Sequence, residues 1–146
     1  MADQPLSDTR AIIETLGLAP HPEGGWYREM WRAPAGPGER AEGTAILFLL
    51  ERGQRSHWHR VDGTEIWFWH AGHPVTLSIA EDDAGPVRDL ALGPDILAGQ
   101  MPQGLVPANA WQAANAGEGW ALVSCTVTPG FEFVGFTLAP PGWSPG

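Results

Sequence analysis

Residues 56–72 read SHWHRVDGTEIWFWHAG, and this stretch decides how the rest of the chain is interpreted. His57 and His59 are two residues apart, so on a β-strand both side chains are predicted to face one side. Asp62-Gly63 is a hairpin signal that would fold the chain back and bring Glu65 beside the two imidazoles. Two histidines and a carboxylate on adjacent antiparallel strands can hold a divalent transition metal. The alternatives are the polar floor of a pocket for an organic ligand, or a polar patch on a barrel wall.

The composition is that of one globular domain. The chain has 146 residues, of which 43% are hydrophobic and 17% charged, which suits a hydrophobic core and not a disordered chain. We expect a single domain over residues 1–146, with irregular tails at 1–6 and 140–146. No apolar run is long enough to span a bilayer, and the N-terminus does not resemble a signal peptide.

The charged residues and the cysteine count exclude several classes of protein. The net charge is −9 without any basic run, which argues against nucleic acid as a partner. All eight basic residues are arginines, so Schiff-base or pyridoxal chemistry on a lysine is impossible. Cys125 is the only cysteine, which excludes an intrachain disulfide and fits a reducing compartment. We therefore expect a cytoplasmic protein with no nucleotide cofactor and no membrane partner.

The hydrophobic pattern predicts one short helix, over residues 7–18, followed almost entirely by strands and turns. Glycine and proline punctuate the strand segments at short intervals, as in sandwiches and barrels. Residues 75–80 and 87–93 are predicted to form a hairpin, and 33–43 a flexible loop. The other predicted strands cover residues 24–32, 44–50, 65–70, 120–127 and 131–139.

Two segments resemble the motifs of the cupin superfamily. The first motif is matched in order by Gly53, His57, His59, Glu65 and Gly72. The second corresponds to residues 107–115, PANAWQAAN, in which Gln112 stands where the third histidine ligand belongs. A closer resemblance is to a small cupin branch with an HPEGG signature and no established reaction. That resemblance covers about residues 8 to 139 and rests on LGLAPHPEGGWYRE (16–29), SHWHRVDGTEIW (56–67), VPANAWQAA (106–114) and CTVTPGFEF (125–133).

The resemblance implies an all-β fold, a cupin jelly-roll barrel with one short N-terminal helix and a ligand cavity at its open end. It also implies a homodimer, which is the usual symmetric oligomer in any case. The implied ligands for Fe, Mn, Ni, Cu or Zn are His57, His59, Glu65 and Gln112. Gln112 offers an amide oxygen, a weaker donor than imidazole, so the alternative is a site that has lost its metal and binds an organic ligand directly.

The aromatic residues suggest the walls of this cavity. If Glu65 faces inward, period two places Trp67 and Trp69 on the same face, and we expect at least one of them to line the pocket. Trp111 adjoins Gln112 and would either roof the cavity or pack outside it. Aromatic walls above a polar floor suit a sugar ring, an aromatic acid or a small cyclic metabolite.

The HPEGG segment offers further ligand contacts. Gly24-Gly25 allows a sharp turn or a close approach of the backbone. Glu23 and Arg28 would contact the ligand, and Arg28 would suit a carboxylate or phosphate group of that ligand. The alternative is that Glu23 and Arg28 form a structural ion pair at the dimer seam. His21 is predicted to be a turn residue and Cys125 inert core.

Three functions are compatible with these residues. The first is isomerisation or epimerisation of a polar, sugar-like or carboxylate metabolite. In this reaction His57 or His59 would move a proton with help from Glu65. Tyr27 is the only tyrosine, so a phenolic acid, if one is used, must be that residue. The second is a metal-dependent oxygenase that uses the same histidines as ligands. The third is a non-catalytic binding or sensing module.

Overall fold

The computed structural model describes residues 6–146. One helix, α1 (Leu6–Leu16), precedes the strands and ends at Gly17, whose φ of 67° lies in the left-handed region that favours glycine. Two contacts attach α1 to the sheet beside it: Thr9 Oγ1 donates to Glu51 Oε2, and Arg28 Nη1 donates to the carbonyl of Leu16. The strands are β1 (Ala19–Pro20), β2 (Trp26–Arg32), β3 (Thr44–Leu50), β4 (Arg55–Val61), β5 (Thr64–Gly72), β6 (Val75–Ala80), β7 (Val87–Leu92), β8 (Gln103–Val106), β9 (Trp111–Asn115), β10 (Ala121–Thr128) and β11 (Phe136–Leu138), with 3-10 turns η1 (Ile96–Ala98) and η2 (Phe133–Gly135).

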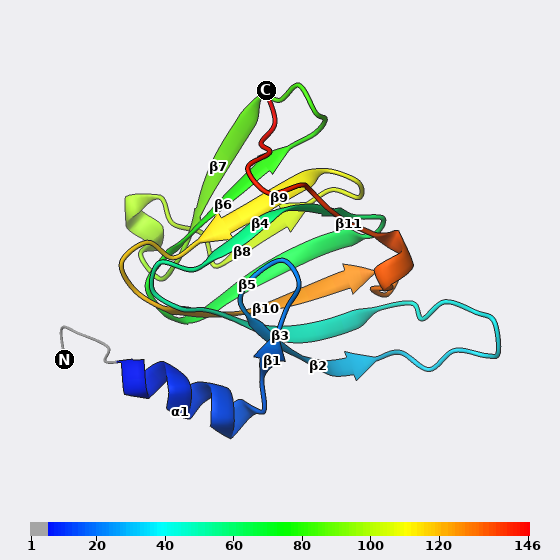
Figure 1. Ribbon diagram of the computed structural model, residues 1–146, viewed down its shortest axis with the longest axis horizontal. Coiled ribbons are helices and arrows are strands. Elements are labelled where there is room, and N and C mark those ends of the chain that lie inside the picture. Colours follow the sequence, from blue (N-terminus) through cyan, green and yellow to red (C-terminus); the bar gives the residue numbers. More distant parts are fainter. Residues whose placement is uncertain (1–5) are drawn as a thin grey trace.

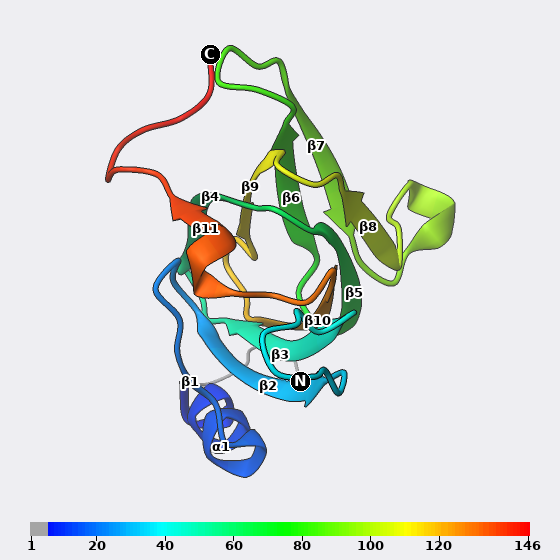
Figure 2. The same cartoon turned by 90° about the vertical axis from the view of Figure 1, so that its right-hand side faces the viewer.

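The strands form two sheets that face each other, as Figures 1 and 2 show. One has the order β1-β2-β3-β10-β5-β8 and the other the order β11-β4-β9-β6-β7. Neighbouring strands pair antiparallel, and many neighbours are distant in sequence, such as β10 between β3 and β5. This is the predicted all-β jelly roll with one short helix, and the prediction is confirmed.

The core lies between the sheets because alternate residues of the central strands point inward. In β10 the pattern is strict, with Ala121, Val123, Cys125 and Val127 all buried. The main cluster also contains Phe48 and Trp67, whose rings meet edge to face at 5.8 Å. None of the helices within residues 6–146 combines the length and the apolar character that crossing a membrane requires.

The predicted hairpin at Asp62-Gly63 is wrong. β4 and β5 belong to different sheets and do not pair, so this turn is a corner where the chain leaves one sheet for the other. Arg40 holds the corner through two hydrogen bonds to the Asp62 carboxylate, of 2.6 and 3.1 Å. Glu65 consequently faces β4 across the cavity instead of standing beside it in one sheet. The predicted hairpin of β6 and β7 is confirmed, with its acidic tip at residues 81–83.

Candidate functional site

A cavity of about 410 Å³ opens between the two sheets. That volume suits a small-molecule ligand. Its floor is polar, its walls are apolar and aromatic, and its rim carries charged side chains. The lining residues are His21, Glu23, Tyr27, Glu29, Arg32, Thr44, Ile46, His59, Val61, Glu65, Cys125, Val127, Phe131, Glu132 and Phe133.

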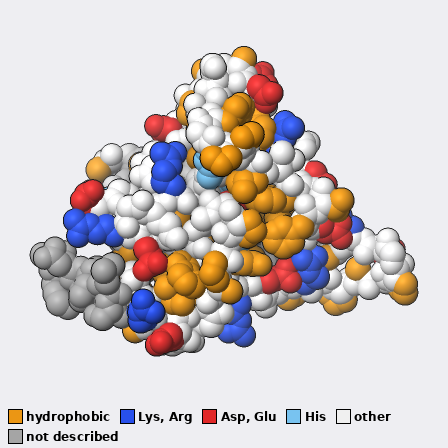
Figure 3. All heavy atoms as spheres, viewed as in Figure 1, with side chains coloured by type: hydrophobic (Ala, Val, Ile, Leu, Met, Phe, Trp, Pro, Cys, Tyr) orange, Lys and Arg blue, Asp and Glu red, His pale blue; other side chains and the backbone are white. Residues whose placement is uncertain are grey.

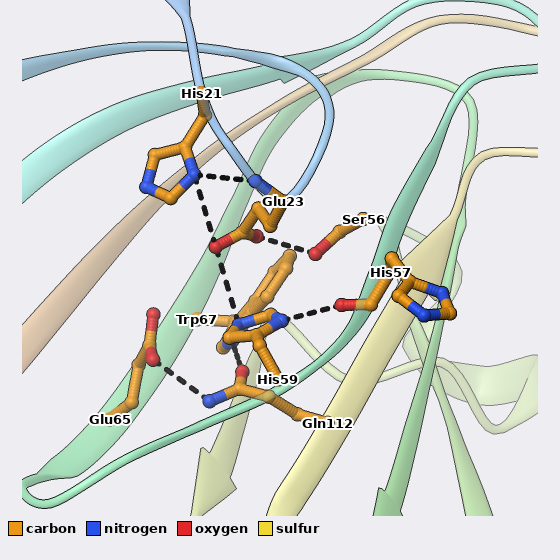
Figure 4. A network of polar contacts seen from close by, with 8 residues as sticks. All are labelled: His21, Glu23, Ser56, His57, His59, Glu65, Trp67 and Gln112. Atoms are coloured by element: carbon orange, nitrogen blue, oxygen red, sulfur yellow. Dashed lines mark hydrogen bonds and ion pairs between the residues drawn. The ribbon is translucent and has the colours of Figure 1, made fainter. Parts of the chain in front are cut away.

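A β-bulge in β4 separates the two predicted histidine ligands. The register of β4 against β9 shifts between Ser56 and His59, so two residues intervene where strict alternation expects one. His59 is buried and faces the cavity, whereas the His57 ring points away from it and contacts the carbonyl of Pro140 at 3.0 Å (Figure 4). The prediction that His57 and His59 share a face is therefore wrong.

The HPEGG segment delivers Glu23 to the cavity. A side chain at Gly24 would put its Cβ 2.1 Å from the carbonyl oxygen of Arg55, and φ at this residue is 107°. Only glycine allows the turn to approach β4 so closely. The His57 backbone N–H then donates to the carbonyl of Glu23 at 2.8 Å, which fixes the turn against β4.

Glu23 lies at the centre of the polar floor (Figure 4). Its Oε2 accepts a hydrogen bond from the Ser56 hydroxyl, and its Oε1 lies 3.3 Å from His59 Nε2 and 3.4 Å from His21 Nδ1. His59 Nδ1 lies 2.7 Å from the carbonyl oxygen of His57, which can only accept, so Nδ1 carries the proton. In the neutral ring, His59 Nε2 is therefore the unprotonated nitrogen, and it is directed at the Glu23 carboxyl group.

His21 supports the same carboxyl group instead of being a mere turn residue. It is buried, and its Nδ1 accepts a hydrogen bond of 3.1 Å from the backbone N–H of Glu23. Its ring packs edge to face on Tyr27, with centroids 4.5 Å apart. Sequence reasoning missed this position because a histidine before a proline in a turn has no distinguishing periodicity.

Glu65, on β5, lies on the opposite sheet from His59, and Gln112 fixes its position. Gln112 Nε2 donates to Glu65 Oε1 at 2.9 Å, and Trp67 Nε1 donates to Gln112 Oε1 at 2.8 Å. The predicted proximity of Gln112 and Glu65 is confirmed. However, the amide oxygen and nitrogen of Gln112 are both bonded to these buried partners, and Gln112 does not line the cavity.

Burial shifts the pKa values of the ionisable side chains at the cavity floor. It raises the pKa of Glu23 to about 8 and the pKa of Glu65 to about 7, although the Ser56 hydroxyl lowers the first and His59 the second. It also lowers the pKa of His59 and brings the pKa of His21 down to about 4. Burial likewise raises the pKa of the Cys125 thiol, which therefore stays protonated. The floor thus holds two carboxyl groups that change charge near neutral pH beside two neutral imidazoles.

Four other predicted contacts lie elsewhere. Trp67 sits in the core beneath Gln112, and Trp69 donates its indole N–H to the carbonyl of His73, so the prediction that one of them lines the pocket is wrong. Period two does place them on the inner face, but deeper than the cavity reaches. Trp111 packs outside the barrel, and Arg28 is turned toward α1.

The aromatic wall comes instead from Tyr27, Phe131 and Phe133. The two phenylalanines belong to the segment that ends in η2 and β11, and their rings meet edge to face at 4.9 Å. Hydrophobic side chains gather over this part of the surface in Figure 3. The strand predicted over residues 131–139 forms only at 136–138, and Phe131 and Phe133 border the cavity.

The predicted metal ligands do not fit a metal in this arrangement. His57 points outward, and the Gln112 amide oxygen and nitrogen are bonded to Trp67 and Glu65. Within residues 6–146, no group of three or more histidine, cysteine, aspartate or glutamate side chains is arranged to hold a metal ion. Glu23 instead lies 3.3 Å from His59 and accepts a hydrogen bond from Ser56, while Glu65 accepts one from Gln112.

Comparisons with known proteins agree with this fold. The model of the family described as cupin superfamily (DUF985) matches residues 10–139. A hypothetical protein from Leishmania major is 32% identical, with a TM-score of 0.80 over 89% of this chain and 86% of that one. A protein from Shewanella oneidensis is 37% identical, with a TM-score of 0.83 over 94% of this chain and 85% of that one.

Oxalate decarboxylase from Bacillus subtilis, which has Mn(II) centres, is 16% identical, with a TM-score of 0.63 over 82% of this chain and 29% of that one. That likeness concerns the fold alone. A search of curated proteins finds no match.

Proposed function

Because this chain belongs to the cupin superfamily, in the family DUF985, we propose that it is a small-molecule-binding cupin that moves a proton on a polar, sugar-like metabolite. The reaction class is isomerisation or epimerisation. The observation that carries the proposal is the 3.3 Å contact between His59 Nε2 and Glu23 Oε1 at the floor of an open cavity.

The pair is suited to proton transfer because Glu23 changes charge near neutral pH and lies beside the unprotonated nitrogen of His59. Burial raises the pKa of Glu23 to about 8, so its carboxyl group holds a proton at pH 7 while His59 stays neutral. An acid or base works best when its pKa lies near the working pH. A carboxyl group and an imidazole with opposite shifts at one cavity floor are typical of a functional site.

The step requires no oxidant or reductant. Glu23 gives its proton to the carbonyl oxygen of the substrate, the C–H bond next to that carbonyl breaks and its proton passes to His59 Nε2, and the electron pair forms the C=C bond of an enol. Glu65 faces the imidazolium that forms and stabilises its charge. A proton returned to the same or to the neighbouring carbon completes the reaction. Tyr27, which lines the same cavity, is the second acid in this scheme.

Hydrogen exchange with solvent tests the proposal without knowledge of the physiological substrate. A panel of aldoses, ketoses and 2-hydroxy acids is incubated with the protein in D2O, and proton NMR follows deuterium uptake at the carbon next to the carbonyl. We expect uptake with at least one compound, and a loss of about 100-fold or more in His59→Gln and Glu23→Gln.

His57→Gln is the matched control, because it removes an imidazole from the adjacent outward position. It should retain the wild-type rate. Equal losses in His57→Gln and His59→Gln, or exchange that survives both floor variants, would contradict the assignment of the proton pair. Saturable binding without any exchange would identify a binding module instead of an enzyme.

A further inference from the structure

The charges that line the cavity are unbalanced. They comprise four glutamates, of which Glu23 holds a proton at pH 7, and, among the described lining residues, a single cation, Arg32. Arg32 already pairs with Glu29 through two hydrogen bonds of 2.7 and 3.2 Å, and it also donates to the carbonyl of Phe131. Its positive charge is therefore committed at the rim, and an anionic ligand would find little to bind.

The histidines do not restore the balance. Burial lowers the pKa of His59 and of His21, so both imidazoles are neutral near pH 7. Glu65 has neutral hydrogen-bonding partners, Gln112 and the Cys125 thiol. When Glu65 is ionised it therefore has no cation beside it among the described lining residues, and a buried carboxylate without a cation is costly.

The walls suit a cation as well. Tyr27, Phe131 and Phe133 present aromatic rings to the cavity, and the face of such a ring attracts a positive charge. The second oxygen of Glu65 points away from Gln112 (Figure 4), and besides Gln112 this carboxylate has only the weakly donating Cys125 thiol as a hydrogen-bonding partner. An ammonium group has three donors and no acceptor, which matches a floor composed mainly of acceptors.

We propose that the ligand of this cavity is a small organic cation that carries an ammonium group, with Glu65 as its counter-ion. The inference rests on the proposed function and narrows it: Glu65 anchors the amine while Glu23 and His59 move the proton nearby. It replaces the sequence-based expectation of a carboxylate or phosphate ligand at Arg28, which is turned toward α1.

Three probes of one shape and different charge test the proposal. Cyclohexylammonium, cyclohexanol and cyclohexanecarboxylate are titrated at pH 7.5 into the full chain, and two-dimensional amide NMR follows the cavity residues. We expect the ammonium to bind about tenfold or more tightly than the alcohol, and the carboxylate to bind most weakly. Equal or tighter binding of the carboxylate, or no ammonium-dependent shift at the cavity, overturns the proposal.

Glu65→Gln then tests the counter-ion, because it keeps the shape and the contact with Gln112 but removes the charge. It should lower ammonium affinity about tenfold and leave cyclohexanol affinity unchanged. Glu81→Gln, on the exposed β6–β7 tip, is the control with the same loss of charge. Equal losses in the two variants overturn the assignment of Glu65. If Glu65→Gln does not fold, the order of the three probes on the wild type still decides the ligand class.

The two proposals fail independently. Probe binding is measured without turnover, and deuterium uptake is measured on compounds that carry no ammonium group. A cation preference without exchange would leave this inference standing and refute the proton pair, whereas exchange of neutral sugars without cation preference would do the reverse.

Discussion

The inner and outer faces of β4 and β9 differ sharply although they are built from adjacent residues. His59 and Gln112 point inward, whereas Trp58 and Trp111 point outward. The outer face is an apolar cluster in which the rings of Trp111 and Trp143 lie 4.6 Å apart, and the Trp111 indole N–H donates to Asp83 at the surface.

The two faces of the β4–β9 pair have different roles, one in stability and one in the cavity. The outer cluster buries apolar area and keeps its polar atoms near water, which stabilises the fold. The inner floor buries carboxyl groups whose pKa values rise to about 7 and 8, an arrangement that costs stability and creates reactive groups. Four experiments test this division.

Trp111→Ala should have the largest effect on stability. Removing a buried outer ring that packs against Trp58, Trp143 and Arg60 should lower the free energy of unfolding by about 3–5 kcal/mol in urea titrations. The folded fraction should keep the wild-type deuterium exchange of the inner floor. A loss below about 1 kcal/mol, or exchange lost in folded protein, would show that the two faces are not separate.

The pH dependence of stability should reveal the inner floor. Between pH 6.5 and 8 the unfolded glutamates are ionised, whereas unfolded His21 and His59, with ordinary pKa values near 6.5, still release protons and offset about 1 kcal/mol of the change. Glu23 and Glu65 have raised pKa values in the folded state, so the native protein holds protons that the unfolded chain has lost. The net free energy of unfolding should therefore fall by about 1–2 kcal/mol as pH rises through this range.

Urea titrations at several pH values measure this slope. Glu23→Gln and Glu65→Gln should each flatten it, because an amide does not titrate. Trp111→Phe, a conservative change on the outer face, should leave the slope as in the wild type. A wild-type slope of zero would mean that the carboxyl groups keep ordinary pKa values.

Gln112→Leu should have an intermediate effect. It leaves the Trp67 indole N–H and one Glu65 oxygen without their partner in the buried floor. The expected loss is about 2 kcal/mol. The pKa of Glu65 should rise further, since the variant lacks the hydrogen bond from the Gln112 amide, which favours the charged form of Glu65. NMR titration of the Glu65 carboxyl carbon measures that pKa, and an unchanged value would contradict the role of Gln112.

His57→Ala should have the smallest effect. Its ring makes one hydrogen bond, to Pro140 near the surface, so the loss should be about 0.5–1 kcal/mol. The pH slope and the exchange rate should match the wild type. A change in either would place His57 in the site after all.

Several features of the site could be predicted from the sequence alone. The short helix, most strands and the cupin likeness follow from periodicity and motif order, and the proximity of Gln112 and Glu65 follows from the two motifs together. Two glycines after Glu23 also indicated a close backbone approach, which the contact of Gly24 with Arg55 now explains. These inferences depend on local patterns, which the chain carries residue by residue.

The tertiary structure decided three features that the sequence did not indicate. These are the face that His57 occupies, the depth of Trp67 and the partners of Arg28. A bulge adds one residue to one strand, and its position depends on pairing with β9, more than fifty residues away along the chain. The corner at Asp62 likewise has the local signal of a hairpin, yet β4 finds its partners in β9 and β11 and β5 in β10 and β8. The sequence determined the residue types of the floor and their order. Long-range pairing decided which of them meet, because a strand's register and the side on which each residue lies are properties of two strands and not of one.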